Sequence, residues 1–543
     1  MRVGLWILSV IAIATACLGQ DQNASPAAQT DPAPILAEAR GLYRRGAFDQ
    51  ALARYNDALK AGPQSGEAYA GIIRCYLKQE KVHEADGVLQ KGLTAAPGNL
   101  DFKVAEGELL FREGQIPEAG ALFNEVIATP PTDTPPNARA YLGAARVAAA
   151  TAMYSRERIM ATRAHALDPA DPEIRKQWML ILPKSEHIHA LEEYLSQPPV
   201  DDAETRRALN DNLATLKTFL HATLGPCRMT STGSETQTGL RILQVSGQLP
   251  HGFGIVAKIN GQDSTLLMDT LAPGIVVSAK FAARAGLKLV PELHVNSILD
   301  KPDSQATLAV AGSVRVGDFE FQDCPIFVTD NKSIVDDGVI GSEVFAQFLI
   351  EMDFSRSNLH LGALPRATEE TPPKPFLQTI DPELANESEA KAGGESTHAD
   401  SYVAPEMGNF IHVFRIGHRV LVPTKINDGP EKLFVLDAEE KDGALATEAA
   451  HETIKVHRAP RQDFRGRDGE MNKVFMADQV VLDFGHVRQT VPNVITYDMS
   501  RVSHQSGTEI SGALSTAILT KLKVRLDYRD GLVDFQYLSL IHI

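Results

Sequence analysis

The sequence has few of the residues from which metal sites are usually built. Its 543 residues include only four cysteines, Cys17, Cys75, Cys227 and Cys324. No C-x-x-C pair and no Cys/His ligand spacing occurs, which argues against a structural zinc site. His187 and His189 do not supply one either, because alternate residues on a helix do not share a face. We therefore expect no metal and no cofactor. A disulfide between Cys227 and Cys324 stays open for a chain in an oxidising compartment.

Basic clusters are missing as well. The chain has 53 Lys and Arg residues against 69 Asp and Glu residues, a net charge of −16, and no run of basic residues interleaved with aromatic ones. Because binding to nucleic acid through counterion release needs such a run, we expect no nucleic-acid partner. With 43% hydrophobic and 22% charged residues the composition is that of a globular protein. The length indicates roughly two to four domains.

The N-terminus holds the one apolar run that is typical of targeting. A charged start is followed by Val3–Ala16, which is too short to span a bilayer comfortably and is typical of an export signal. Two processing routes stay open for Ala14–Cys17: the small residues fit signal cleavage, and the stretch also resembles a bacterial lipobox, which would make Cys17 a lipidated N-terminus. We expect a signal peptide over residues 1–19 and a polar tether over residues 20–34. The mature protein would then lie in the periplasm, or at an envelope membrane through Cys17 alone.

A motif recurs every 34 residues in the first part of the chain. Each copy has an alanine, an aromatic residue or Leu four positions later, and a proline twelve positions after the alanine. The copies are Ala51, Tyr55 and Pro63; Ala85, Leu89 and Pro97; and Ala119, Phe123 and Pro131. The small residue lets two helices approach, the large one fills the next gap, and the proline ends the second helix. This period resembles the tetratricopeptide repeat, which implies an all-α solenoid over residues 35–222 and binding of proteins or extended peptides.

The apolar pattern changes from helical to alternating after Pro226. Asn260-Gly261 is a hairpin signal between two alternating runs, and strand-like pattern fills residues 237–365 and 410–539. Residues 366–409, rich in Pro, Glu and Ser, are expected to be a linker.

The two strand-rich segments look like copies of one another. Each has a hairpin that ends in an aspartate, Asp269 in the first and Asp437 in the second. A short apolar segment follows in each, Asp337–Gly341 and Ser511–Ser515, and then a short helix and a closing strand. This order resembles the lobe of retropepsin-like and pepsin-like aspartic peptidases.

The resemblance implies a multidomain fold in which an all-β bilobal domain follows the solenoid. In that family each lobe supplies one aspartate, and the pair shares a proton and activates water, so Asp269 and Asp437 are the catalytic candidates. The substrate-binding candidates that it implies are Thr270, Gly274, Gly338 and Gly341. Asp353 and Asp527, although matched between the lobes, precede a hairpin and are expected to be turn residues.

Both aspartate turns depart from the Asp-Thr/Ser-Gly motif of the family. Leu271 stands where a Gly brings its backbone against the carboxylate, and a bulky residue crowds that approach. In the second turn Ala438 and Glu439 replace both the hydroxyl residue that braces the two turns and the Gly, and Ser515 replaces the Gly that the first lobe keeps as Gly341. We therefore expect a degenerate peptidase.

The preferred function is recognition, by an exported scaffold that binds proteins or extended peptides. The alternative is an active aspartic endopeptidase that uses Asp269 and Asp437. A third class is a purely structural assembly protein, in which the repeats do the work and the lobes are spacers.

Overall fold

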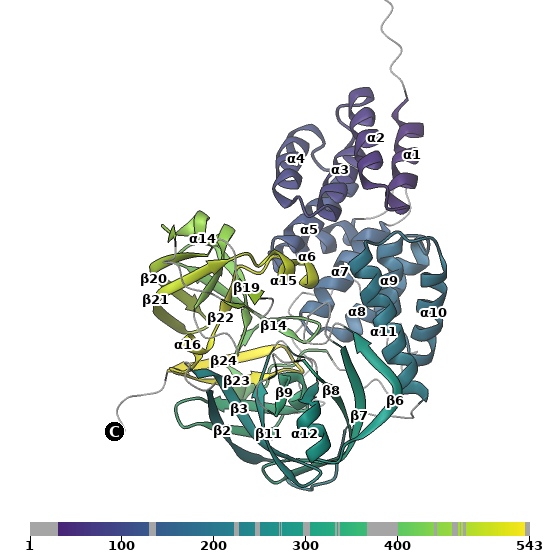
Figure 1. Cartoon of the computed structure of the whole chain (residues 1–543). Helices are drawn as coiled ribbons and strands as arrows, with labels where there is room; N and C mark the ends of the chain where they lie inside the picture. Colours follow the sequence, from purple (N-terminus) through teal and green to yellow (C-terminus); the bar gives the residue numbers. More distant parts are fainter. Residues whose placement is uncertain are drawn as a thin grey trace, which may run out of the picture.

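The structure, a computed structural model, has an N-terminal block of helices followed by two strand-rich lobes (Figure 1). It describes residues 31–129, 137–221, 227–244, 250–270, 272, 274–296, 305–331, 334, 337–365, 400–438, 443–458, 465–466, 469–470 and 474–537. The expected signal peptide and Cys17 lie outside these residues, as do most of the tether and of the linker. Helix α1 (Pro32–Arg44) begins within the segment expected to be a tether, with Asp31 capping its N-terminus.

The helices form antiparallel neighbours along the chain. They are α2 (Phe48–Ala61), α3 (Gly66–Lys78), α4 (Val82–Ala95), α5 (Leu100–Arg112), α6 (Ile116–Ala128), α7 (Ala138–Ala150), α8 (Tyr154–Leu167), α9 (Pro172–Leu180), α10 (Lys184–Ser196) and α11 (Ala203–His221). The first helix of each later unit starts at a polar residue whose side chain accepts a backbone N–H, and these caps are Ser65, Asn99, Asn137 and Asp171. Such a cap satisfies donors that a helix start leaves open, so the boundaries follow from local sequence.

Phe123 shows why the repeat needs one large residue beside small ones. Its ring is buried and lies against the backbone of Gly107 in α5 and of Gly143 in α7. A Cβ on Gly107 would lie 2.8 Å from the ring, and a Cβ on Gly143 would overlap it. The ring thus fills the space beside Gly107 and Gly143, which have no side chains, as expected from the repeat.

Lobe 1 extends from Cys227 to Pro365. Its elements are β1 (Arg228–Met229), β2 (Thr236–Gln244), β3 (Pro250–Ile259), β4 (Gln262–Met268), β5 (Ile275–Ser278), α12 (Ala279–Arg284), β6 (Lys288–Asn296), β7 (Gln305–Val316), β8 (Phe319–Thr329), β9 (Gly338–Ile340), η2 (Ser342–Phe345), β10 (Phe348–Asp353) and β11 (Asn358–Ala363). Strand β1 precedes the expected start at residue 237 and pairs with β8. Beside that pairing, Cys227 and Cys324 form a disulfide, with Cα atoms 4.4 Å apart.

Lobe 2 begins before the expected boundary at residue 410, because residues 400–409 are already packed against the protein. Its elements are η3 (Pro405–Met407), β12 (Ile411–His412), β13 (Phe414–Ile416), β14 (Arg419–Ile426), β15 (Glu431–Leu436), β16 (Ala444–Ala446), α14 (Thr447–Thr453), β17 (His457–Arg458), β18 (Arg465–Gly466), β19 (Gly469–Glu470), β20 (Phe475–Phe484), β21 (Val487–Tyr497), α15 (Ser500–Ser506), β22 (Gly512–Leu514), α16 (Thr516–Leu519), β23 (Leu522–Asp527) and β24 (Leu532–Tyr537). Met407 and Phe410 are buried beside Leu532.

The two lobes repeat one topology. In lobe 1, β4 pairs in parallel with β9, β9 pairs antiparallel with β5, and β5 pairs in parallel with β8. In lobe 2, β15, β22, β16 and β21 make the same series of pairings. The hairpin turn Asn260-Gly261 has positive φ at both residues, as predicted from its sequence. Hairpins like these are local, whereas the parallel pairs join distant segments.

The lobes are joined edge to edge by β10 and β23. These strands pair antiparallel, with Glu351 opposite Arg525 near the middle of the register. The order β24-β23-β10-β11 places equivalent hairpins on either side of that junction. A single buried cluster contains apolar residues of both lobes, among them Ile350 and Val524.

The helical block is docked on lobe 2. Leu142 and Ala145 of α7 share one buried cluster with Phe414 and Leu433 of lobe 2. A hydrogen bond also joins the two parts, since Thr508 Oγ1 of lobe 2 donates to the carbonyl oxygen of Phe111 in α5 at 2.7 Å. In Figure 1 helices α5 and α6 lie next to α15 of this lobe. Among the described helices none is both long and apolar enough to cross a membrane.

Replacing Gly143 by Ala is expected to destabilise the repeats. The added methyl group would overlap the Phe123 ring, and overpacking of this kind costs about 1–3 kcal/mol. Gly87→Ala in α4 is the matched control, because a Cβ there meets nothing within 4 Å and should stabilise the helix by about 0.5–1 kcal/mol. Urea unfolding followed by circular dichroism gives both changes. A shift in the same direction for the two variants would contradict the packing argument.

Candidate functional site

Asp269 and Asp437 occupy equivalent positions at the ends of β4 and β15. The backbone N–H of Asp269 donates to the carbonyl oxygen of Ile340 at 3.0 Å, and that of Asp437 donates to Leu514 at 3.1 Å. Each bond extends the parallel ladder of its lobe by one residue. The structure therefore places both sequence-predicted aspartates at the same step of the same topology.

Thr270 connects the two aspartate turns. Its hydroxyl donates to the carbonyl oxygen of Leu436 and accepts the backbone N–H of Ala438 at 3.3 Å. Leu436 and Ala438 flank Asp437, and Thr270 follows Asp269, so the two turns meet at one buried point. This brace comes from lobe 1 alone. Ala438, the residue of lobe 2 at the equivalent position, has no hydroxyl with which to bind the first turn.

The two aspartates differ in exposure. Asp269 retains 1% of its accessible surface, whereas Asp437 is half-buried. In a carboxyl pair that shares a proton one group is protonated and the other ionised, and burial disfavours the ionised form. Leu271 and Glu439 lie outside the described residues, so their expected disturbance of the turns stays a prediction.

The glycines expected to bind substrate are explained by close backbone packing. A Cβ on Gly338 would overlap the carbonyl oxygen of Val276, and one on Gly341 would overlap that of Ala272. Gly274 has a φ of +64°, which favours glycine, and its carbonyl oxygen accepts the N–H of Gly341 at 2.8 Å. These contacts hold the first turn together, and a role of the glycines in substrate binding stays a prediction.

Glu343 is a residue of the site that the sequence did not indicate. It lies in η2, and its carboxylate accepts the backbone N–H of Gly274. Burial raises the pKa of Glu343, while the Gly274 N–H and the charge of Arg415 act against that rise. No motif marks this position, because its role depends on a turn 69 residues earlier in the chain.

Arg415 lies where all three parts of the protein meet. Its guanidinium is 4.0 Å from the ring centroid of Tyr528 in lobe 2, and it donates to the hydroxyl of Tyr154 at the start of α8. Its charge also acts on Glu343 of lobe 1. A cation over an aromatic ring is attracted to it, so Arg415 contributes to the contact between lobe 2 and the repeats.

Asp353 and Asp527 are turn residues, as the sequence predicted. Asp353 accepts the backbone N–H of Arg356 and the hydroxyl of Ser355, each at 2.9 Å. Asp527 accepts the backbone N–H of Asp530 at 3.0 Å in the equivalent turn. Within the described ranges, His, Cys, Asp and Glu form no group of three or more that could hold a metal.

Two protein families match parts of the sequence. The model of the aspartyl protease family matches residues 255–344, which run from β3 into η2 and include the first aspartate turn. The model of the tetratricopeptide repeat matches residues 42–105. The chain therefore carries tetratricopeptide repeats in its N-terminal part and an aspartyl-protease domain after them, as the resemblances implied. No curated protein matches the sequence.

Solved structures that match the chain include a tetratricopeptide-repeat protein and a type IV pilus biogenesis factor. PilF of Pseudomonas aeruginosa is 19% identical, with 35% of this chain and 86% of PilF covered and a TM-score of 0.25. A thermophilic tetratricopeptide-repeat protein of Thermus thermophilus is 21% identical, with coverage of 34% and 99% and a TM-score of 0.27. PilW, a type IV pilus biogenesis factor, is 21% identical, with coverage of 36% and 89% and a TM-score of 0.26.

Loss of the Thr270 hydroxyl is expected to destabilise the lobes. Thr270→Val keeps the shape but leaves the Leu436 carbonyl and the Ala438 N–H buried without this partner, which costs about 1–3 kcal/mol for a buried group. Thr270→Ser keeps the hydroxyl and is the control. Urea unfolding of the three proteins measures the difference. Equal stability of the Val and Ser variants would mean that the brace contributes nothing.

The stability of the lobes is expected to fall as the pH rises from about 4 to about 7. Burial, together with the charge of Asp530, raises the pKa of Asp527 to about 7. The folded protein therefore favours protonated Asp527. The stability that this preference contributes is fully present below the pKa of an aspartate in the unfolded chain, and it is lost as the pH rises to the pKa of Asp527 in the folded protein. Melting temperatures at a series of pH values test this, and Asp527→Asn should flatten the profile. A variant profile parallel to that of the wild type would rule the assignment out.

Proposed function

We propose that this chain, which joins tetratricopeptide repeats to an aspartyl-protease domain, is an exported protein-binding scaffold whose peptidase-like lobes do not cleave peptides. The observation that carries the proposal is the one-sided brace between the aspartate turns. Catalysis by a carboxyl pair needs both groups held in a fixed mutual geometry, and errors on the order of 1 Å lower the rate severely. With Ala438 opposite Thr270, the second turn lacks its own brace.

Export is supported by the disulfide and by the N-terminal sequence. The bond between Cys227 and Cys324 closes a loop of lobe 1, and such bonds persist in oxidising compartments. The apolar run Val3–Ala16 is typical of an export signal. We propose a periplasmic or envelope location, either free or held through a lipid on Cys17.

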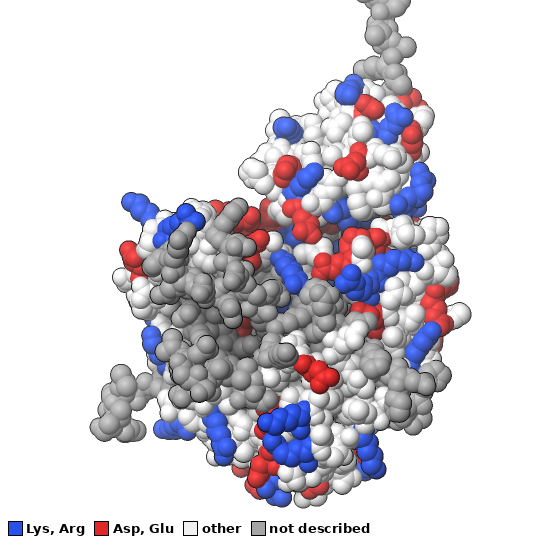
Figure 2. Space-filling model, viewed as in Figure 1, with Lys and Arg blue, Asp and Glu red and all other residues white. Residues whose placement is uncertain are grey.

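The face proposed for partner binding is formed by the first helices of successive units. Glu173 at the start of α9 binds Lys78 of α3 at 2.7 Å, Arg146 of α7 at 2.7 Å and Lys176 at 2.9 Å. Its side chain is 11% exposed, whereas Lys78 and Arg146 are 31% and 33% exposed. The buried carboxylate thus holds two cations at the surface. In Figure 2 acidic and basic side chains alternate over the region of α7 and α9.

A second set of ion pairs joins the first helices of three units on this face. Arg139 of α7 binds Glu108 of α5 at 3.2 Å and Asp171, the cap of α9, at 2.7 Å. Both acids are nearly buried, so the pairs are little screened by salt. A repeat surface that is held rigid binds a partner without first having to be ordered, which favours affinity.

Site-specific cross-linking tests the binding face. A photo-reactive residue in place of Arg146 is expected to form adducts with envelope proteins, and one in place of Leu93 on the exposed side of α4 is not. Leu93 is a suitable control because it is also at the surface of the repeats. Adducts at both positions, or at neither, would contradict binding through the first-helix face.

A peptidase assay tests the other half of the proposal. The retention of Asp269, Asp437 and the Thr270 brace favours the alternative of an active aspartic endopeptidase. We expect the purified protein to leave a mixed peptide library intact at acidic pH. Cleavage that disappears in the Asp269→Asn variant would show that the enzyme is active.

A further inference from the structure

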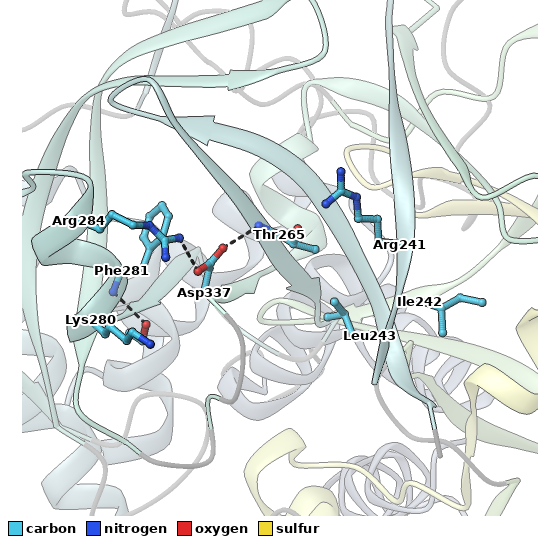
Figure 3. Close-up of a pocket in the computed structure, with 9 residues that line it drawn as sticks. Arg241, Ile242, Leu243, Thr265, Lys280, Phe281, Arg284 and Asp337 are labelled. Carbon is cyan, nitrogen blue, oxygen red and sulfur yellow. Dashed lines mark hydrogen bonds and ion pairs between the residues drawn. The ribbon is translucent and has the colours of Figure 1, made fainter. Parts of the chain in front are cut away.

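A pocket of about 380 Å³ opens in lobe 1 between β2 and α12 (Figure 3). Its walls come from elements far apart in the sequence: Arg241 to Leu243 on β2, Thr265 on β4, the first turns of α12, and Asp337 just before β9. Thr265 lies four residues before Asp269, which is about 13 Å along a strand. The pocket is therefore distinct from the candidate catalytic turn.

Gly254 on β3 lies against two of the residues that line this pocket, Thr265 and Leu243. It lies opposite Arg241 on β2 and opposite Leu267 on β4. A Cβ at this position would overlap the methyl group of Thr265 and lie 3.0 Å from the side chain of Leu243. The side chains of Thr265 and Leu243 thus occupy the space over Gly254, and any other residue at that position would displace them.

The charges in the pocket are unequal. Asp337 is satisfied at both oxygens, by Arg284 at 2.7 Å and by the backbone N–H of Thr265 at 3.1 Å. Two further cations, Arg241 and Lys280, form no ion pair within the described part of the chain, and Figure 3 places them on opposite sides of Asp337. In Figure 2 basic side chains gather over the position of α12. Three cations against one carboxylate leave two positive charges in a chain whose net charge is −16.

Apolar surface and an open strand edge accompany these charges. The side chain of Ile242 is 55% exposed beside Arg241. Pairing of β2 with β11 ends at Gly239, so that Arg241–Gln244 pairs with β3 alone among the described strands. A strand edge of this kind accepts an extended polypeptide through backbone hydrogen bonds.

We propose that this pocket binds an extended acidic segment of a partner polypeptide. Carboxylates of that segment pair with Arg241 and Lys280, and an apolar side chain beside them covers Ile242. Arg284 is already held by Asp337 and lies 4.9 Å from the ring centroid of Phe281, which keeps the wall of the pocket in place. The site belongs to lobe 1, so it adds a second contact to a scaffold whose proposed binding face lies on the repeats.

Binding of a defined peptide to the full-length protein tests the proposal. The probe is a fluorescent peptide of alternating Leu and Glu, and its counterpart has Gln in place of every Glu. The variant Arg241→Gln/Lys280→Gln removes the two cations. The variant Lys258→Gln/Arg315→Gln removes the same charge elsewhere on lobe 1, where both cations have carboxylate partners. Circular dichroism of all proteins checks that they remain folded.

The acidic peptide is expected to bind the wild type and the control variant equally. Binding to Arg241→Gln/Lys280→Gln should be weaker by about tenfold or more, the loss expected for charged hydrogen bonds, and the Gln peptide should not bind. Equal affinity of the two peptides, or of the two double variants, would overturn the proposal. It would also be overturned if inorganic phosphate bound through Arg241 and Lys280 while the acidic peptide did not. The cross-linking test concerns only the repeats, so the outcome of the peptide-binding test on lobe 1 does not depend on it.

Discussion

The pairing of β10 with β23 is the contact on which the bilobal arrangement depends. It joins the closing hairpins of the two lobes in one register, with Glu351 opposite Arg525. Each hairpin is connected through a short helix to the strand that runs parallel to β4 or β15. Fixing the hairpins therefore brings the ends of β4 and β15 together, and with them Asp269 and Asp437.

The aspartate turns of the two lobes differ in their side chains. Lobe 1 keeps Asp269, the Thr270 hydroxyl, and the close approach of Gly341 to the backbone. Lobe 2 keeps Asp437 on the ladder but has Ala438 and Ser515 at the two other positions. The parallel ladder needs only backbone hydrogen bonds, so it tolerates these changes, whereas a carboxyl pair depends on the side chains. The backbone ladders of the two lobes thus match, while the side chains at the two aspartate turns differ.

The repeats are packed against lobe 2, which shares a buried core with the helices. Phe414 and Leu433 belong to that shared core, and Arg415 meets Tyr154 of α8 beside it. Two surfaces with different chemistry are proposed to bind partners. One is the ion network around Glu173 on the first helices, and the other is the basic pocket of lobe 1. Glu173 holds two cations at the first surface, and Asp337 holds Arg284 in the wall of the second.

The sequence by itself determined what short-range rules control. The period that carries Phe123 predicts the helix pairs, and Asn260-Gly261 predicts a hairpin, because capping, close packing and turn geometry act between near neighbours. Tertiary structure alone decided that Cys227 bonds to Cys324, that Glu343 supports the first turn, and that Arg241 and Lys280 face one pocket. These groups lie far apart along the chain and carry no motif. Long-range strand pairings bring them to the same parts of the fold.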